Sequence, residues 1–354
     1  MHIAVMSGDD VGPEITAAAL VVLDAADRAF GLGLRFEDVE VGMASHRRDG
    51  TTLTDTALAK ASAADGVILG PCGMTAYPPR EDGGINVPGT VRKQLDLYAN
   101  LRPARSRPGV PGARAGLDVL VVRENTEGFY ADRNMFRGIA EFMPTPDVAL
   151  SVRKITREGS RRIAAVAFDY AKRRTRRITA VGKQHVLQMT DGLFMGEAFA
   201  AAKANPDVEL REMDVDAMAA HLVLRPERHD VVLITNMFGD ILSNEAAALS
   251  GGLGLAGALN AGDAHAVANA GHGSAPDIAG RDIVNPVGII LSSAMLLEWL
   301  GVRRGVPAYV AASAAIGRAI DRALGDAAGR TPDLGGRGGT AAFGRLIAGH
   351  VRAD

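Results

Sequence analysis

The chain alternates short, strongly apolar runs with longer amphipathic stretches. The apolar runs have the length of buried strands and cover residues 2–8, 35–42, 66–70, 118–125, 177–183, 208–215 and 230–236. Residues 13–29 carry helical signals, because Pro13 suits a first helical turn and Glu14 lies where the helix dipole favours negative charge. Strands separated by helices predict an α/β fold with a largely parallel sheet.

A second helical pattern covers residues 157–177. Its apolar residues share one face, and arginines occupy the opposite one. These arginines are typical either of a nucleic-acid surface or of a solvated face, and the formal net charge of −2 favours the solvated face. We therefore expect no nucleic-acid partner. Two zones rich in Gly and Pro, 71–90 and 250–286, interrupt the pattern. The second zone is long for a loop without regular structure in a compact domain, so we expect it to have a binding role.

Composition narrows the class of protein. A chain of 354 residues can build one large domain or two medium ones. Cys72 is the single cysteine, which excludes an internal disulfide framework and a metal site built from cysteines. The first residues lack the features of a signal peptide, and no apolar stretch approaches the ~20 residues of a membrane span. We expect a reduced, cytoplasmic protein with no membrane partner.

Several charged or polar residues stand at the ends of predicted elements. If Arg92, Arg102 and Arg123 converge, their guanidinium forks match the carboxylates of a di- or tricarboxylate. Tyr130 follows the strand that carries Arg123. Lys183 ends another strand, where desolvation and a nearby metal would lower its pKa and let the neutral amine accept a proton. A lysine with a solvated head is the alternative.

Two carboxylates also follow strands. Asp216 and Asp240 can supply oxygen ligands from two strand ends, a pattern that suits Mg²⁺ or Mn²⁺. The alternative is a pair of helix N-caps, a common role for Asp. The eight histidines show no paired spacing of metal ligands, so a zinc site is not expected.

Taken together, these segments resemble the isocitrate/isopropylmalate dehydrogenase family, whose members are metal-dependent enzymes that oxidise and decarboxylate (R)-malate derivatives. The resemblance extends over essentially the whole chain, in the family's order. Its motifs are GDDVGPE (8–14), NLRP (100–103), RENTEGFY (123–130), GKQHVLQMTDGLF (182–194), VDAMA (215–219), NMFGDILSNEA (236–246), HGSAPDIAG (272–280), NP (285–286) and TPDLGG (331–336).

The resemblance implies an architecture. It is an α/β, isopropylmalate dehydrogenase-like fold with two domains around a central active-site cleft, not a Rossmann fold. Residues 1–97 with 250–354 would form the large nucleotide-binding domain, and residues 98–249 the small domain with the dimer interface. The resemblance further implies a homodimer with shared active sites, to which Lys183 and Asp216 come from the neighbouring subunit.

The same resemblance implies roles for the polar residues. Arg92, Arg102 and Arg123 would hold the carboxylates of a small hydroxy-dicarboxylate substrate, and Asp216 and Asp240 would hold Mg²⁺ or Mn²⁺. The metal would polarise the new ketone, so that CO₂ leaves and an enolate forms.

Two further side chains would move the protons of this reaction. Lys183 would take the hydroxyl proton, directly or through water, as hydride leaves for NAD⁺. Tyr130 would then protonate the enolate.

The cofactor is read from the loop 272–286. By resemblance, the cofactor-binding residues are His272, Gly273, Ser274, Ala275, Asp277 and Asn285, with His272 and Asn285 at the adenine. Asp277 would accept hydrogen bonds from the ribose hydroxyls and repel a 2′-phosphate. Members of the family that use NADP resemble each other in a Lys–Tyr pair there, whereas this chain has Asp277–Ile278. We therefore expect NAD.

The chain departs from the family pattern at two places. Asn244 stands where the pattern DILSDEA has a second Asp, so it keeps a carbonyl ligand but loses a charge, and we expect weaker metal binding or a role behind the ligands. In the segment that reads the C3 substituent, Asn86 can hydrogen-bond a carboxylate or hydroxyl, while Pro88 offers no donor.

These departures leave the C3 substituent open among isopropylmalate, isocitrate, tartrate and D-malate. Asn244 also leaves open a non-catalytic regulatory subunit that binds nucleotide or acid.

Overall fold

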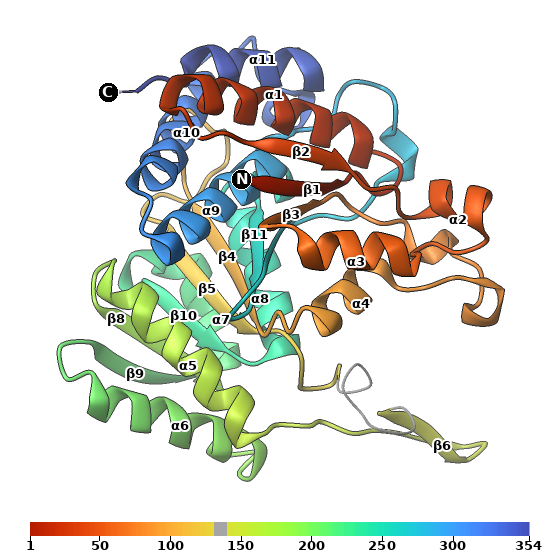
Figure 1. Ribbon diagram of the computed structural model, residues 1–354. Coiled ribbons are helices and arrows are strands. Elements are labelled where there is room, and N and C mark those ends of the chain that lie inside the picture. Colours follow the sequence, from red (N-terminus) through yellow and green to blue (C-terminus); the bar gives the residue numbers. More distant parts are fainter. Residues whose placement is uncertain (131–139, 354) are drawn as a thin grey trace.

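A computed structural model of the protein describes residues 1–130 and 140–353. In this part of the chain, one ten-stranded sheet has the order β2-β1-β3-β12-β11-β4-β5-β10-β8-β9 (Figure 1). Its strands are β1 His2–Met6, β2 Arg35–Asp38, β3 Gly66–Leu69, β4 Ala99–Arg105, β5 Asp118–Glu124, β8 Arg177–Gly182, β9 Glu209–Asp214, β10 Val231–Ile234, β11 Gly257–Ala261 and β12 Ala266–Ala270. The predicted α/β class is confirmed.

The middle of the sheet differs from the sequence prediction. There β11 runs antiparallel to both β12 and β4, and β4 runs antiparallel to β5, while the other pairs are parallel. The zone 250–286, expected to be a binding loop, contains β11 and β12. That expectation is wrong in part, because these strands consist mostly of Ala, Gly and Asn, which give a weak strand signal.

Helices cover both faces of the sheet. They are α1 Gly12–Phe30, α2 Met43–Asp49, α3 Asp55–Ala63, α4 Val87–Gln94, α5 Arg157–Lys172, α6 Thr190–Ala204, α7 Val215–Leu224, α8 Asn236–Leu249, α9 Val287–Arg304, α10 Pro307–Gly325 and α11 Thr340–His350. The two helices predicted from the sequence, α1 and α5, are present. Pro13 lies in the first turn of α1, and Thr156 caps α5 by accepting the Gly159 amide proton at 3.1 Å.

The hydrophobic core is continuous on one face of the sheet and divided on the other. On the continuous face, α1, α5, α6, α9, α10 and α11 share one cluster of buried residues, with bulky members such as Phe168, Phe194 and Phe343. On the divided face, α3 and α4 pack on β1 and β3 in one cluster, and α7 and α8 pack on β5 and β10 in another. In the described ranges, no helix is long and apolar enough to cross a membrane.

Four asparagines occupy the space between the two clusters of the divided face. Asn260 of β11 accepts amide protons from Asn100 of β4 at 2.8 Å and from Asn125 at 2.9 Å, and it donates to Asn269 of β12 at 2.6 Å. We call these residues the asparagine row. Asn100, Asn125 and Asn260 are buried, so the row satisfies polar groups that water cannot reach.

A small second sheet pairs β6 Glu141–Thr145 with β7 Val148–Ser151. This β6–β7 hairpin projects away from the body of the molecule (Figure 1). It exposes large apolar side chains, among them Phe142, Met143 and Leu150. An exposed apolar hairpin of this kind is typical of a surface that another chain covers.

Replacing the central member of the asparagine row tests its role in stability. Asn260→Leu removes one hydrogen bond from each of Asn100, Asn125 and Asn269, and we expect a loss of about 2–4 kcal/mol in the free energy of unfolding. Urea denaturation measures this. The matched control is Asn205→Leu, where the amide bonds only Ala201 of its own helix, and we expect a loss below about 1 kcal/mol. Equal losses in both variants would contradict the assignment.

Candidate active site

Asp240 lies at the centre of a cluster of charged groups. It belongs to the start of α8, which begins directly after β10, and one of its oxygens accepts a hydrogen bond from Arg123 Nη1 at 2.5 Å. The same oxygen lies 3.4 Å from Arg102 Nη1, and the other lies 3.5 Å from the Tyr130 hydroxyl. Thr235 is the N-cap of α8. The alternative that Asp240 caps this helix is therefore wrong.

Arg123 is fixed rigidly in this cluster. Only 3 % of its surface is exposed, and Asn236 Oδ1 accepts hydrogen bonds from its Nε at 2.9 Å and its Nη2 at 2.6 Å. Asn236 in turn donates to the Glu127 carbonyl at 3.0 Å. The sequence reasoning did not assign Asn236, although its position at the end of a buried strand was a usable signal. The arrangement holds the guanidinium in place before any ligand binds.

Arg102 approaches Asp240 from the neighbouring strand. Its Nε donates to Asn100 of the asparagine row at 2.7 Å, and its Nη1 donates to Ser243 at 3.0 Å and to Asn244 Oδ1 at 3.3 Å. Burial lowers the pKa of Arg102, and the charge of Asp240 opposes this shift. A cation that has lost part of its hydration favours an anionic ligand beside it. The side-chain carbonyl of Asn244 therefore contacts one of the arginines that were predicted to bind the substrate.

Two other predicted substrate residues lie on and just before α4. Arg92 lines a hollow of about 300 Å³ together with Asn125, Glu127 and Lys154. Asn86 caps α4 by accepting the Gly89 amide proton at 2.8 Å. The structure thus brings Arg102 and Arg123 together at Asp240. It places Arg92 on α4, in the lining of the hollow. The carbonyl of Asn86 is used within its own helix, which leaves its amide group for a ligand.

Lys183 lies in a different cluster, where β8 and β9 end. Its Nζ donates to Asp216 and, at 3.2 Å, to Asp214, the residue that precedes α7. Both carboxylates raise the pKa of Lys183, with the hydrogen bond to Asp216 as the largest cause. The lowered pKa was predicted for a lysine beside a bound metal ion and stays a prediction, whereas in the single chain the two carboxylates favour the charged form. His185 Nδ1 also lies 3.2 Å from Asp214.

The predicted metal ligands are divided between these two clusters. Asp240 and Asn244 face the arginines, whereas Asp216 pairs with Lys183. Within residues 1–130 and 140–353, no group of three or more His, Cys, Asp or Glu side chains is arranged to hold a metal ion. The predicted ligands thus form two separate groups of oxygen donors in one chain, of the kind that Mg²⁺ and Mn²⁺ prefer.

The predicted cofactor loop borders a hollow of about 440 Å³. Its mostly apolar lining includes His272, Ala275, Ile278 and Asn285. The Nδ1 of His272 lies 2.9 Å from the Gly273 carbonyl, and its buried Nε2 has no hydrogen-bond partner among the described residues. Burial lowers the pKa of His272, so the ring stays neutral. An apolar hollow with one unsatisfied ring nitrogen fits a heterocyclic base that supplies the missing hydrogen bond.

The loop is fastened to the first turn of the chain. The Val11 amide donates to the Ser274 carbonyl at 3.1 Å, and the Gly280 amide donates to Glu14 at 3.1 Å. Ala275 has a positive φ of 44°, which turns the chain sharply. Asp277 follows within a short 3₁₀ turn and is exposed, as is Gly273. The segment GDDVGPE therefore supports the loop.

The C-terminal motif completes the hollow. Asn285 donates to Asp333 at 3.0 Å and accepts the Val287 amide proton at 3.0 Å. Thr331 also donates to Asp333, at 2.5 Å. The sequence reasoning did not assign Asp333, although its motif TPDLGG was itself the signal.

Comparison with known proteins decides the family. The family model described as isocitrate/isopropylmalate dehydrogenase matches residues 2–347. The chain belongs to this family. This membership confirms the family to which the motifs pointed and the isopropylmalate dehydrogenase-like fold. It also makes the protein an oxidoreductase that decarboxylates hydroxy acids.

Individual relatives are similar over nearly their full length. An isocitrate/homoisocitrate dehydrogenase of Thermus thermophilus is 40% identical over 343 residues, which cover 97% of this chain and 96% of that protein. A 3-isopropylmalate dehydrogenase of Methanothermobacter thermautotrophicus is 39% identical over 352 residues, covering 99% and 98%. The crystal structure of isocitrate dehydrogenase from Methylococcus capsulatus matches with a TM-score of 0.87 at 38% identity, covering 99% of both chains.

Proposed function

We propose that the protein is an NAD-dependent, metal-dependent dehydrogenase that converts an (R)-malate derivative to a 2-oxo acid and CO₂. The observation that supports this most directly is the cluster in which Arg102, Arg123 and Tyr130 meet Asp240. Two guanidinium groups, a phenolic hydroxyl and a carboxylate would provide the polar and charged groups that bind a hydroxy acid and stabilise its reaction.

Substrate binding rests on the two arginines. In the free site their charge is compensated by Asp240. A substrate carboxylate that enters between them would make charge-assisted hydrogen bonds to guanidinium groups that are already oriented. Arg92 would then contact the remainder of the acid from α4. Asn86, at the start of α4, would offer its amide to the C3 substituent.

The oxygen donors fit a hard divalent cation. Asp240 and the Asn244 carbonyl lie on one face of α8, four residues apart. Asp216 would complete the set from the partner subunit. Bound there, Mg²⁺ or Mn²⁺ would act as a Lewis acid toward the oxygen that becomes the ketone.

Lys183 and Tyr130 would handle the two protons. Lys183 can accept the hydroxyl proton only as the neutral amine, and Asp214 and Asp216 now favour its charged form. If the oxygens of Asp216 bound the metal ion, they would no longer accept the hydrogen bond from Lys183. The pKa of Lys183 would then fall. Tyr130 lies beside Asp240, and its hydroxyl would deliver a proton to the enolate carbon after CO₂ has left.

The hollow at His272 is the proposed place for the adenine of the cofactor. The unsatisfied Nε2 of His272 supports this, since a base nitrogen or amino group would pair with it. Gly273, Ser274 and Ala275 would follow the adenosine, with Asn285 holding the hollow in shape. Asp277 is exposed, so its carboxylate would meet the ribose hydroxyls and disfavour NADP.

The identity of the acid is tested by one parallel assay. Purified protein with NAD⁺ or NADP⁺, and with Mn²⁺ or EDTA, is offered (R)-malate, tartrate, isocitrate, homoisocitrate and 3-isopropylmalate. We expect the appearance of NADH absorbance with at least one acid, at least about tenfold faster with NAD⁺ than with NADP⁺, and its loss in EDTA. A folded protein that binds NAD⁺ and oxidises none of these acids would favour the non-catalytic regulatory subunit instead.

A nucleic-acid role receives no support from the arginines of α5. Arg161 pairs with Glu158 at 2.6 Å, Arg162 pairs with Asp96 at 2.6 Å, and Arg173 pairs with Asp169 at 2.9 Å. Their charge is neutralised along the helix. They are therefore a solvated, ion-paired face.

We further propose that the chain is a homodimer with shared sites. The exposed apolar residues of the β6–β7 hairpin, together with Leu224 of α7 and Ile241 of α8, support an interface in the half formed by residues 98–249. The proposed small domain coincides with the run of strands β4, β5, β10, β8 and β9 at one side of the sheet. The partner's Lys183 and Asp216 would then complete each cleft.

Subunit complementation tests the shared site. Lys183→Ala and Tyr130→Phe each remove activity, but a mixed dimer of the two keeps one intact site if Lys183 acts across the interface. Co-refolding equal amounts should therefore restore about a quarter of wild-type activity. Mixing two Tyr130→Phe preparations is the control. No recovery in dimers shown to be mixed would place Lys183 and Tyr130 in the same site of one chain.

The effect of Asn244 is tested by restoring the missing charge. Because cation sites are tuned by the number of charged ligands, Asn244→Asp should tighten Mn²⁺ binding by about tenfold. The electron paramagnetic resonance signal of free Mn²⁺ measures this without turnover. Asn205→Asp adds the same charge at the end of α6 and should leave the affinity unchanged. Equal affinity in both variants would mean that residue 244 does not face the metal.

A further inference from the structure

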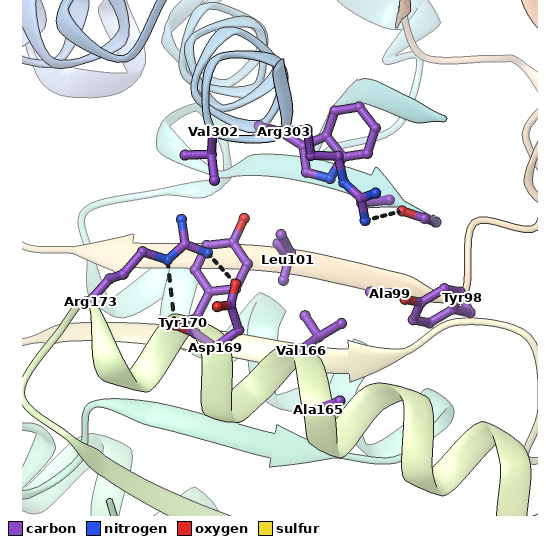
Figure 2. Close-up of a pocket in the computed structure, with 13 residues that line it drawn as sticks. Tyr98, Ala99, Leu101, Ala165, Val166, Asp169, Tyr170, Arg173, Val302 and Arg303 are labelled. Atoms are coloured by element: carbon purple, nitrogen blue, oxygen red, sulfur yellow. Dashed lines mark hydrogen bonds and ion pairs between the residues drawn. The ribbon is translucent and has the colours of Figure 1, made fainter. Parts of the chain in front are cut away.

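A hollow of about 200 Å³ lies between α5 and α9, on the face of the sheet opposite Asp240 (Figure 2). We call it the α5–α9 groove. Its floor is β4, from which Ala99 and Leu101 point into it. Its walls are Val166 and Tyr170 of α5 and Trp299 and Val302 of α9. None of these side chains belongs to the proposed catalytic cleft.

The groove separates helices that pack on different strands. α5 packs on β5, β8 and β10, whereas α9 packs on β3, β11 and β12, which leaves β4 between them. One ion pair crosses from α5 to α9, between Arg173 and Glu298 at 3.7 Å. In the proposed division into domains, the two walls belong to different domains. The width of the groove therefore depends on how the domains are arranged.

Three aromatic rings line the groove, and a guanidinium covers each of them. Arg173 lies 4.2 Å from the centre of the Tyr170 ring, and Arg303 lies 4.6 Å from that of Trp299. Arg162 covers the Tyr98 ring, also at 4.2 Å. Rings held by such contacts have little freedom to collapse into the space. Preformed aromatic walls over an apolar floor favour a flat aromatic ligand.

The charges of the rim cancel. Arg173 pairs with Asp169 at 2.9 Å as well as with Glu298, and Arg303 lies 3.8 Å from Asp263. A ligand therefore meets little net charge, and a neutral one is favoured. Burial raises the pKa of Tyr170 to about 12, so its hydroxyl stays protonated and can donate or accept one hydrogen bond.

Strand β4 connects the groove to the cleft. Side chains alternate along a strand, so Ala99 and Leu101 face the groove while Asn100 and Arg102 face the other side. There Asn100 belongs to the asparagine row and Arg102 contacts Ser243, Asn244 and Asp240. A shift of β4 by a ligand pressed on Leu101 would move Arg102, because the two residues are neighbours in one strand.

We propose that the α5–α9 groove is a second small-molecule site for a neutral, planar heteroaromatic ligand of one or two rings, and that its occupation changes the affinity of the cleft for the acid substrate. The volume of the groove excludes a dinucleotide, since sites for larger ligands begin at about 300 Å³. The coupling half of this proposal rests on the proposed function. The binding half does not.

Binding is measured with benzimidazole, a neutral planar probe with two fused rings. Trp299 is the single tryptophan of the chain, so tryptophan emission reports on the groove alone. We expect a saturable change in emission with a Kd of about 1 mM or tighter. NAD⁺ alone should leave the emission unchanged, because the hollow at His272 contains no tryptophan, and it should not displace benzimidazole, because the two hollows share no lining residue.

A matched pair of variants localises the signal. Val302→Phe should abolish the emission change, since Val302 is 49 % exposed at the rim and a ring there fills the groove without entering the core. Val21→Phe makes the same change on α1, where the side chain is 42 % exposed, and should bind as the wild type does. The proposal is overturned if wild-type emission shows no saturation, or if Val302→Phe binds with wild-type Kd.

Coupling is measured as the KM for the accepted acid with and without saturating benzimidazole. We expect a change of about fivefold or more, which Val302→Phe should no longer show. If benzimidazole changes the emission but leaves the KM unchanged, the coupling half of the proposal is refuted and the binding half stands. A protein that oxidises no acid would refute the proposed function, while the emission experiment would still decide whether the groove binds its ligand.

Discussion

The asparagine row is the constraint on which the cleft depends. A sheet face covered by helices normally closes through one apolar layer, as it does here on the side of α1, α9 and α10. On the other side, Asn269, Asn260, Asn100 and Asn125 bond to one another across adjacent strands. These polar side chains interrupt the apolar layer, so the buried apolar residues of this face form two separate clusters. Arg102 is anchored to the polar row between them.

Electrostatic organisation follows from this row. Arg123 is held by Asn236, and Arg102 is held by Asn100, so two buried cations are fixed before any ligand arrives. In the free protein, the carboxylate of Asp240 compensates the charge of both arginines. An anion or cation that enters the site would have to displace this carboxylate from them. The free site is in this sense a closed set of ion pairs. In the proposed function, a bound substrate would replace these pairs with equivalent ones, so the arginines would need little reorganisation.

The sequence allowed prediction of those parts of the fold that rest on strong local patterns. Strands such as Val231–Ile234 are uninterrupted runs of apolar residues, and both predicted helices formed. Strands β4, β11 and β12 were missed because Ala, Asn, Gly and Arg do not favour strands locally, and only their neighbours in the sheet hold them. The convergence of Arg102, Arg123 and Tyr130 on Asp240 could be inferred from motifs. The raised pKa of Lys183 could not, because it depends on contacts with Asp216 and Asp214, which lie on other elements and which no local pattern indicates.

The route of the chain through the sheet also orders its synthesis and folding. Strands β4, β5, β8, β9 and β10 all lie between residues 99 and 234, so this half can complete its ladder as soon as that segment has emerged from the ribosome. The other half pairs β3 with β12 and packs α1 against α11, which joins residues near the two ends of the chain. Its N-terminal strands keep an unpaired sheet edge until the C-terminal part of the chain has been made. Contacts with so long a separation in sequence are of the kind that forms late in folding.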